Sequence, residues 1–165
     1  KRISISRVFE SIAIFNLHEY ALKILNQYES RLEDKNIQFT LNCPIDLTIK
    51  HDSTAYIQIL EQLIDNSCSH AFEQQDTGNI IITIEAEPNR ICIEYHDDGI
   101  GVSRVNQERM FVPFYTTKPN GQGIGLLLCR NIIEQHGGQL TLTNNPGKLG
   151  ATASIKLPLS PQNKR

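Results

Sequence analysis

Hydrophobic and polar positions alternate with two different periods along the chain, and together these periods predict an α+β fold. Apolar residues recur every three to four positions, the spacing of one helix face, at residues 17–35, 53–71 and 124–136. Strand-like alternation or short apolar runs between turn residues occur at residues 8–15, 37–41, 47–49, 80–87, 90–96, 139–144 and 151–157. Because most successive strands are joined by hairpin-like turns, we expect a mixed, mostly antiparallel sheet with the helices on one face. This is a two-layer α/β sandwich rather than a doubly wound parallel sheet.

Residues at the segment ends support the helix assignment. Asn16 precedes the first helix, and Glu19 follows three residues later, which is the arrangement of a capping box. Asp52 or Ser53 can cap the second helix, and Gly137 follows the third, as glycine often does where a helix ends. We therefore expect three helices with defined ends.

The composition is that of one ordinary domain. The chain has 165 residues, 39% of them hydrophobic, so we expect a single domain over residues 1–165 with its core at about residues 8–159. The net charge is -2, and the sequence has no basic stripe that would indicate nucleic-acid binding. No apolar run approaches the roughly 20 residues that cross a bilayer. We expect this domain in the cytoplasm without direct membrane contact, as a piece of a longer protein whose own membrane attachment stays open.

The cysteines indicate a reducing compartment. They lie far apart, form no CxxC pair and fall within apolar patterns; they are Cys43, Cys68, Cys92 and Cys129. We expect four reduced thiols in the core, with a disulfide or a metal site as the alternative.

A carboxylate followed by glycines ends the predicted strand at residues 90–96. Asp97 is followed by Gly99 and Gly101, and glycine lets a ligand lie against bare backbone. A carboxylate accepts hydrogen bonds but cannot donate them, so it suits the exocyclic amine of adenine. Guanine carries a carbonyl at the corresponding position, and two acceptors facing each other would repel. This segment therefore predicts a site for an amino-purine.

A second group of glycines opens into the third predicted helix. Gly121, Gly123 and Gly125 precede it, and the unpaired N–H groups and positive dipole end of a helix N-terminus bind phosphate. The pattern is neither a Walker A loop, since no GK[ST] follows, nor a Rossmann fingerprint, since no strand leads into it. A loop without a ligand is the alternative for this segment taken alone.

Polar residues form a stripe beside the apolar face of the second helix. Gln62, Asn66 and His70 follow one another at one-turn spacing and can face a cleft. The Asn66 amide oxygen suits Mg²⁺, and His70 and Lys118 can neutralise phosphate charge. Taken singly, each has an alternative as a surface side chain. The other histidines show no ligand spacing and are interpreted as structural or exposed; they are His18, His51 and His136.

Four motifs in this order resemble the ATP-binding catalytic domain of sensor histidine kinases, within the wider family of gyrase, the MutL proteins and the ninety-kilodalton chaperones. They are an N box at 59–71, a first glycine box Asp97-x-Gly99-x-Gly101, a phenylalanine box at 111–118 and a second glycine box Gly121-x-Gly123-x-Gly125-Leu126. Residues 150–152 resemble the last shared turn. The resemblance covers residues 8–159 and implies a Bergerat-type ATP-binding fold.

The resemblance implies a role for each motif residue. Asp97 would hold the adenine amine, with Thr152 nearby through water, and Asn66 would bind Mg²⁺ between the phosphates. Residues 114–123 would form a lid over ATP. The implied nucleotide contacts are Asn66, Asp97, Gly99, Gly101, Phe114, Thr117, Lys118, Gly121, Gly123, Ile124, Gly125, Leu126 and Thr152, and the implied catalytic residues are Asn66, Gln62, His70 and Lys118.

The implied activity is transfer of the γ-phosphate of MgATP to a histidine on a separate helical-hairpin domain, which then serves a response regulator. No such hairpin is visible in this sequence, and His18 beside Glu19 lies where the first helix of the family belongs. Gln62 stands where hydrolytic relatives carry a glutamate base, which disfavours an ATPase more than a kinase. A nucleotide-sensing module without phosphotransfer, a GHKL-type ATPase or clamp, and a serine kinase of the anti-sigma type are the alternatives.

Overall fold

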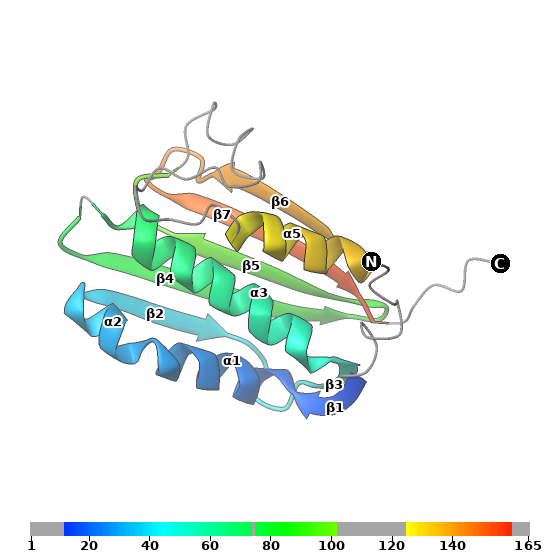
Figure 1. Ribbon diagram of the computed structural model, residues 1–165. Coiled ribbons are helices and arrows are strands. Elements are labelled where there is room, and N and C mark those ends of the chain that lie inside the picture. The colour runs from blue at the N-terminus through cyan, green and yellow to red at the C-terminus, as the bar shows by residue number, and fades with distance from the viewer. Residues whose placement is uncertain (1–11, 74, 102–124, 160–165) are drawn as a thin grey trace, which may run out of the picture.

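The computed structural model describes residues 12–73, 75–101 and 125–159, and its centre is a five-stranded sheet. The strand order is β2-β4-β5-β7-β6 (Figure 1). The strands are β2 (Ile37–Asn42), β4 (Gly78–Glu87), β5 (Arg90–Asp97), β6 (Gln139–Asn144) and β7 (Ala151–Pro158). Only the β2–β4 pair is parallel in this sheet, and the other neighbours are antiparallel. The predicted mixed, mostly antiparallel sheet is confirmed.

Two short strands pair outside the main sheet. β1 (Ile12–Asn16) runs antiparallel to β3 (Thr48–Asp52), and each leads directly into a helix. The strand expected at residues 47–49 therefore exists but belongs to a second, two-stranded sheet. This small sheet joins the beginnings of two helices and so fixes where they start.

The helices lie together on one face of the main sheet (Figure 1). They are α1 (Leu17–Gln27), α2 (Glu29–Asp34), α3 (Ser53–Asn66) and α5 (Gly125–Gln135), and α3 continues into a π-helical turn, η2 (Ser67–Ala71). The prediction of one continuous helix over 17–35 is wrong, because the chain turns at Tyr28, whose N–H bonds to Leu25 O at 3.1 Å. No helix in the described ranges is long and apolar enough to cross a membrane.

Helix ends follow the sequence signals. The Asn16 side chain accepts the Glu19 N–H at 2.9 Å, as predicted for the start of α1. Asp52 caps α3 by accepting the N–H groups of Thr54 at 3.1 Å and Ala55 at 3.3 Å. Gly137 adopts a φ of 74° directly after α5. The two side-chain caps satisfy N–H groups that have no partner within the helix, and the turn at Gly137 provides donors for the last carbonyl oxygens of α5.

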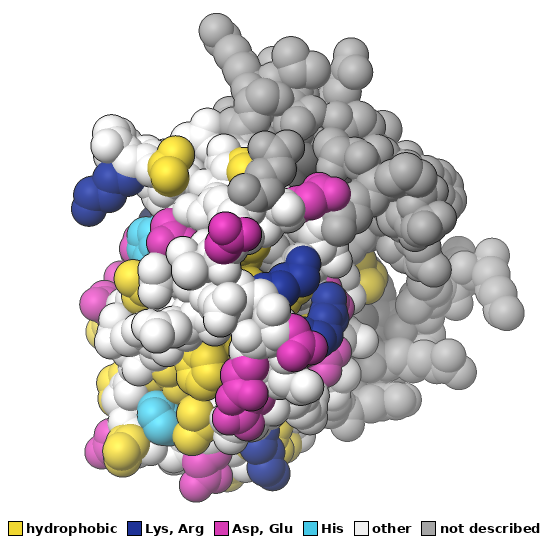
Figure 2. Space-filling view, turned by 90° about the vertical axis from the view of Figure 1, so that its left-hand side faces the viewer, with side chains coloured by type: hydrophobic (Ala, Val, Ile, Leu, Met, Phe, Trp, Pro, Cys, Tyr) yellow, Lys and Arg dark blue, Asp and Glu magenta, His cyan; other side chains and the backbone are white. Residues whose placement is uncertain are grey.

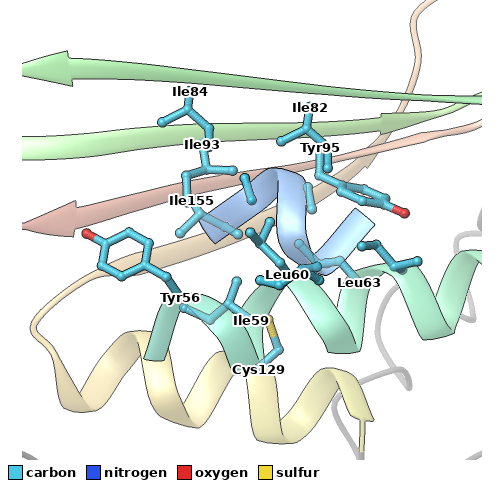
Figure 3. Close-up of a cluster of buried hydrophobic side chains, with 14 of the residues drawn as sticks. Tyr56, Ile59, Leu60, Leu63, Ile82, Ile84, Ile93, Tyr95, Cys129 and Ile155 are labelled. Carbon is cyan, nitrogen blue, oxygen red and sulfur yellow. The ribbon is translucent and has the colours of Figure 1, made fainter. Parts of the chain in front are cut away.

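The core lies between the sheet and α3 (Figure 3). Isoleucines of the sheet meet apolar side chains of the helix there; the shared cluster includes Ile59, Leu60, Leu63, Ile82, Ile84, Ile93 and Ile155. In β7 every second residue from Ala151 to Leu157 is buried, and the residues between them are not. One face of β7 is therefore apolar and covered, and the described helices lie on that side of the sheet.

All four cysteines are free thiols, as predicted, but they do not share one environment. Cys68 and Cys129 are buried, whereas Cys43 and Cys92 are partly exposed. Burial raises the pKa of Cys129 to about 12 and that of Cys43 to about 11. The core position expected for every cysteine is therefore wrong for two of them.

A buried hydrogen bond joins the beginning of α3 to the end of α5. His136 Nε2 lies 2.9 Å from Asp52 Oδ2, and the two side chains are 6% and 8% exposed. Beside this pair, His51 Nδ1 lies 2.9 Å from the Tyr56 hydroxyl. Burial, and then the neighbouring His136, lower the pKa of His51. Both His51 and His136 are structural, as predicted.

Removing the charge of Asp52 should destabilise the protein measurably. Asp52→Asn keeps a good N-cap and should still lower the free energy of unfolding by about 1–3 kcal/mol, because a buried hydrogen bond to a carboxylate is lost. The control is Asp65→Asn, which breaks the Arg31–Asp65 pair, whose side chains are 50% and 43% exposed. That exposed pair should contribute about 0–1 kcal/mol. Urea unfolding measures both, and equal losses would contradict the expectation.

Candidate functional site

The N box and the first glycine box lie where α3 and β5 end, at the same end of the molecule (Figure 1). The loop after β5 lies directly on η2, because Ile100 N–H donates to Ala71 O at 2.9 Å. A Cβ at Gly99 would lie 2.3 Å from Ala71 O, so no larger residue fits this approach. Gly99 therefore allows the carboxylate loop and the helix end to form one site.

Asp97 is the buried acceptor of this site. Its side chain is 8% exposed. Oδ1 accepts the N–H groups of Gly99 at 3.0 Å and Ala151 at 3.4 Å, and Oδ2 accepts the Ser67 hydroxyl at 3.3 Å. Burial raises the pKa of Asp97, the negative charge of Asp98 adds to this, and the three hydrogen bonds oppose it. Donors from three different segments therefore orient one carboxylate.

Sequence reasoning missed Ser67 and Tyr95. The Tyr95 hydroxyl lies 2.8 Å from Ser67 Oγ, and both side chains are buried. The available signals were the position of Ser67 directly after Asn66 and that of Tyr95 two residues before Asp97 on the same strand face. Burial raises the pKa of Tyr95 well above its ordinary value, so its hydroxyl keeps its hydrogen.

The expectation that Thr152 lies beside the Asp97 carboxylate is wrong. In the sheet Asp97 is opposite Ala151, whereas Thr152 is opposite His96. Successive strand residues point to opposite faces, so the Thr152 side chain lies on the other face of the sheet. Its hydroxyl is 2.7 Å from His96 Nδ1 and also donates to Asn145 Oδ1.

The turn before β7 closes the site from the side. Asn145 Nδ2 donates to Asp97 O at 3.0 Å and to Leu149 O at 2.9 Å. Gly150 has a φ of 97°, and a Cβ there would lie 1.8 Å from Asp97 O. The backbone around Asp97 is therefore held by a turn that requires glycine at position 150.

Gln62 of the polar stripe lies against the beginning of α5. Gln62, Asn66 and His70 are all partly buried. A Cβ at Gly125 would lie 2.8 Å from Gln62 Oε1, so this amide reaches the first residue of α5. Leu126 is 7% exposed and anchors the same end of α5 in the core. The structure thus brings Gln62 and Gly125 together, on the same side of the molecule as Asn66.

Contacts from α1 and α2 hold the end of α3 from the outer side. The Lys35 ammonium donates to Cys68 O at 2.7 Å, within the π-helical turn that carries His70. The other two contacts are Tyr28 OH with Glu61 O at 3.4 Å and Arg31 with Asp65 at 2.6 Å. Figure 2 views this end of the molecule and shows acidic and basic side chains intermixed over its described part.

Six of the predicted site residues lie outside the described part of the chain. They are Phe114, Thr117, Lys118, Gly121, Gly123 and Ile124. The lid expected over residues 114–123 falls in the same range. Their roles stay predictions. Gly101, which follows the carboxylate loop, is described and has a φ of 73°.

Comparison with known proteins gives relatives along most of the chain. Sensor histidine kinase ZraS of Salmonella typhi is 36% identical over 149 residues, which are 87% of this chain and 30% of that protein. The catalytic domain of histidine kinase ThkA matches with a TM-score of 0.78 and 29% identity, covering 90% of this chain and 95% of that structure. ThkA in complex with the response regulator protein TrrA matches with a TM-score of 0.73 and 26% identity, covering 93% and 43%.

The chain spans between 14% and 30% of the length of the first curated relatives. A family model described as histidine kinase-, DNA gyrase B-, and HSP90-like ATPase matches residues 51–161. That range holds every motif from the polar stripe to the turn before β7, and the predicted resemblance is confirmed. The chain therefore belongs to the family of histidine kinase-, DNA gyrase B- and HSP90-like ATPases.

Proposed function

We propose that this chain binds ATP through Asp97 and is the catalytic domain of a longer sensor histidine kinase. The observation that carries the proposal is the buried, acceptor-only carboxylate at the end of β5, held by donors from η2, its own loop and β7. A 6-amino-purine presents the donor that such a carboxylate needs, and a 6-oxo-purine presents an acceptor. Adenine would lie against Gly99, where the backbone carries no side chain.

The phosphates would extend from Asp97 toward α3 and the beginning of α5. Asn66 can supply one oxygen to Mg²⁺, which keeps several waters and needs few protein ligands. The bound ion would supply charge neutralisation of the phosphates. Lys118, Gly121 and Gly123 would contact the phosphates, and Gly125 opens α5, whose N–H groups point the same way. His70 would add positive charge beside them.

The proposed reaction is phosphoryl transfer to a histidine on a separate helical-hairpin domain of the full-length protein. The acceptor nitrogen would form a bond to the γ-phosphorus, and the bond between that phosphorus and the β–γ bridging oxygen would break to release ADP. The protein would contribute positioning and charge, since no base is needed to activate water. A response regulator would then receive the phosphate, as the name of the ThkA–TrrA complex supports.

The position of Gln62 favours this reaction over hydrolysis. A water-activating residue must accept a proton, and an amide cannot. Gln62 Oε1 lies against Gly125, so this side chain is placed to position phosphates or α5 rather than to act as a base. Nucleotide sensing without phosphotransfer remains the alternative to test.

The test combines binding with transfer. The chain should bind ATP more tightly with Mg²⁺ than without it, and should bind GTP weakly under both conditions. Mixed with the isolated acceptor domain and ATP labelled at the γ-phosphate, it should pass the label to a histidine of that domain. Binding without label transfer would favour the sensing module, and steady release of phosphate without an acceptor would favour an ATPase.

A further inference from the structure

A chain of two hydroxyl groups ends on the Asp97 carboxylate. The Tyr95 hydroxyl lies 2.8 Å from Ser67 Oγ, and Ser67 Oγ lies 3.3 Å from Asp97 Oδ2. Tyr95 is 3% exposed and Ser67 is fully buried. Figure 3 shows Tyr95 within the apolar layer between the sheet and α3, beside Ile82, its partner across the β4–β5 pair. This chain of hydrogen-bonded hydroxyls thus begins in the core and ends at the site.

The chemistry of the groups fixes the direction of this chain. An ionised carboxylate only accepts, so Ser67 must donate its single hydroxyl hydrogen to Asp97, and Tyr95 must donate to Ser67. Ser67 is the only hydrogen-bond partner of the Tyr95 hydroxyl among the described residues. An ionised carboxylate oxygen accepts a hydrogen bond more strongly than an oxygen of the protonated carboxyl. The hydrogen bond from Ser67, which Tyr95 holds in this direction, therefore favours the ionised form of Asp97.

The hydrogen bonds also limit what Asp97 can still accept. A carboxylate has about four acceptor positions, two on each oxygen. Gly99 and Ala151 occupy both positions on Oδ1, and Ser67 occupies one on Oδ2. Among the described residues no further donor reaches Asp97, so one position on Oδ2 is left for a ligand donor.

We propose that Tyr95 and Ser67 are specificity-determining positioning residues, whose hydroxyls keep Asp97 ionised with one open acceptor position. This arrangement admits a purine with a 6-amino group and rejects a purine with a 6-oxo group, whereas a protonated Asp97 could donate to the 6-oxo group. The inference rests on the proposed binding of ATP at Asp97. It assigns part of the discrimination to two residues beneath the site.

The surroundings of Asp97 make the contribution of the two hydroxyl groups necessary. Burial and the adjacent Asp98 raise the pKa of Asp97, and the Ser67 hydroxyl lowers it together with the two backbone donors. The other titratable groups acting on Tyr95 are Cys68 of η2 and Tyr28, and both raise its pKa. Among the described residues no cation lowers the pKa of Asp97, so in this part of the chain neutral donors alone oppose the effect of burial.

The test uses Tyr95→Phe and Ser67→Ala in the 165-residue chain. ATP and ITP, which differ at the purine 6-position, are titrated calorimetrically from about pH 5.5 to about pH 8.5, a range spanning values reached by buried carboxyls. In each variant ATP binding should be lost at a higher pH than in the parent chain. The preference for ATP over ITP should fall about three- to tenfold at neutral pH, as expected for losing one hydrogen bond of ordinary strength.

Two controls separate the possible results. Tyr56→Phe removes a buried hydroxyl bonded to His51 at the opposite end of α3, and it should reproduce the parent profile. The Asp97→Asn variant has no carboxyl group at this position, so any pH dependence of its binding reports the titration of the nucleotide alone. If Asp97→Asn binds ATP like the parent chain, the proposed function itself fails. If Asp97→Asn loses binding while the Tyr95→Phe and Ser67→Ala profiles superimpose on the parent, or weaken ATP and ITP equally without a pH shift, the role assigned to the two hydroxyls is overturned.

Discussion

Replacing Asp97 with asparagine should weaken ATP binding by about 1–3 kcal/mol, which is roughly five- to 150-fold in Kd. The isosteric amide keeps the shape of the side chain but removes its charge. The new side chain could also present its NH₂ group to the adenine amine, so that two donors would face each other. Isothermal titration of the parent chain and the variant with ATP measures the loss directly.

This loss of affinity should not come from unfolding. Burial raises the pKa of Asp97, so between the ordinary value and this raised value the folded state binds more protons than the unfolded state. Stability therefore falls as pH rises through that window, and the ionised carboxylate costs folding free energy at neutral pH. Asp97→Asn removes this cost but also removes the Oδ2 acceptor of the buried Ser67 hydroxyl. The two effects oppose each other, so the free energy of unfolding should stay within about 1–2 kcal/mol of the parent chain and the variant should remain folded. A variant that is unfolded under the binding conditions, or one that binds ATP normally, would contradict the expectation.

Gly150→Ala should have the largest effect on stability. Gly150 has a φ of 97°, and a Cβ there would lie 1.8 Å from Asp97 O and 2.7 Å from Asp98 Cα. Both contacts are with backbone, so the turn before β7 must move away from the carboxylate loop. We expect a loss of about 3 kcal/mol or more in the free energy of unfolding, because backbone strain and a clash add.

Gly147→Ala is the matched control in the same turn. Gly147 has a φ of 62°, and nothing lies within 4 Å of a Cβ placed there. This variant carries only the left-handed backbone penalty, about 1–2 kcal/mol. Denaturant unfolding of both variants should therefore show a clear difference, and ATP titration should show a loss only for Gly150→Ala. Similar results for the two would mean that the close approach to Asp97 is unimportant.

Local patterns predicted the framework of the molecule. The alternation of apolar residues predicted β4, β5, β6 and β7 and the hairpin-like pairs β4–β5 and β6–β7, and the cap residues Asn16 and Asp52 predicted two helix starts. These features depend on neighbouring residues, so periodicity and capping chemistry are sufficient to find them. The placement of Asp97 against Gly99 is equally local.

Such local patterns cannot predict contacts between residues that are far apart in the sequence. Ser67 and Asp97 are 30 residues apart, and Asp52 and His136 are 84 apart. Nothing in the local sequence of either residue records its partner. The prediction for Thr152 was wrong for a related reason, because a shift of one residue along a strand exchanges the two faces of the sheet. The phase of β7 is set by its pairing with β5, which places Ala151 opposite Asp97.

The two ends of α3 have separate tasks. Its beginning is held by the Asp52–His136 pair, far from the motifs, and its end carries Asn66 and Ser67 toward Asp97. Changes at the beginning should therefore affect stability, whereas changes at Asp97 should affect binding. The contrast between Asp52→Asn and Asp97→Asn follows from this separation.

A crystal structure of the chain with a non-hydrolysable ATP analogue tests the central claim most directly. We expect the exocyclic amine of adenine within hydrogen-bond distance of Asp97 Oδ2, with the purine against Gly99 and the phosphates toward Asn66 and the beginning of α5. A purine bound elsewhere on the protein, or one whose amine does not contact Asp97, would contradict the account.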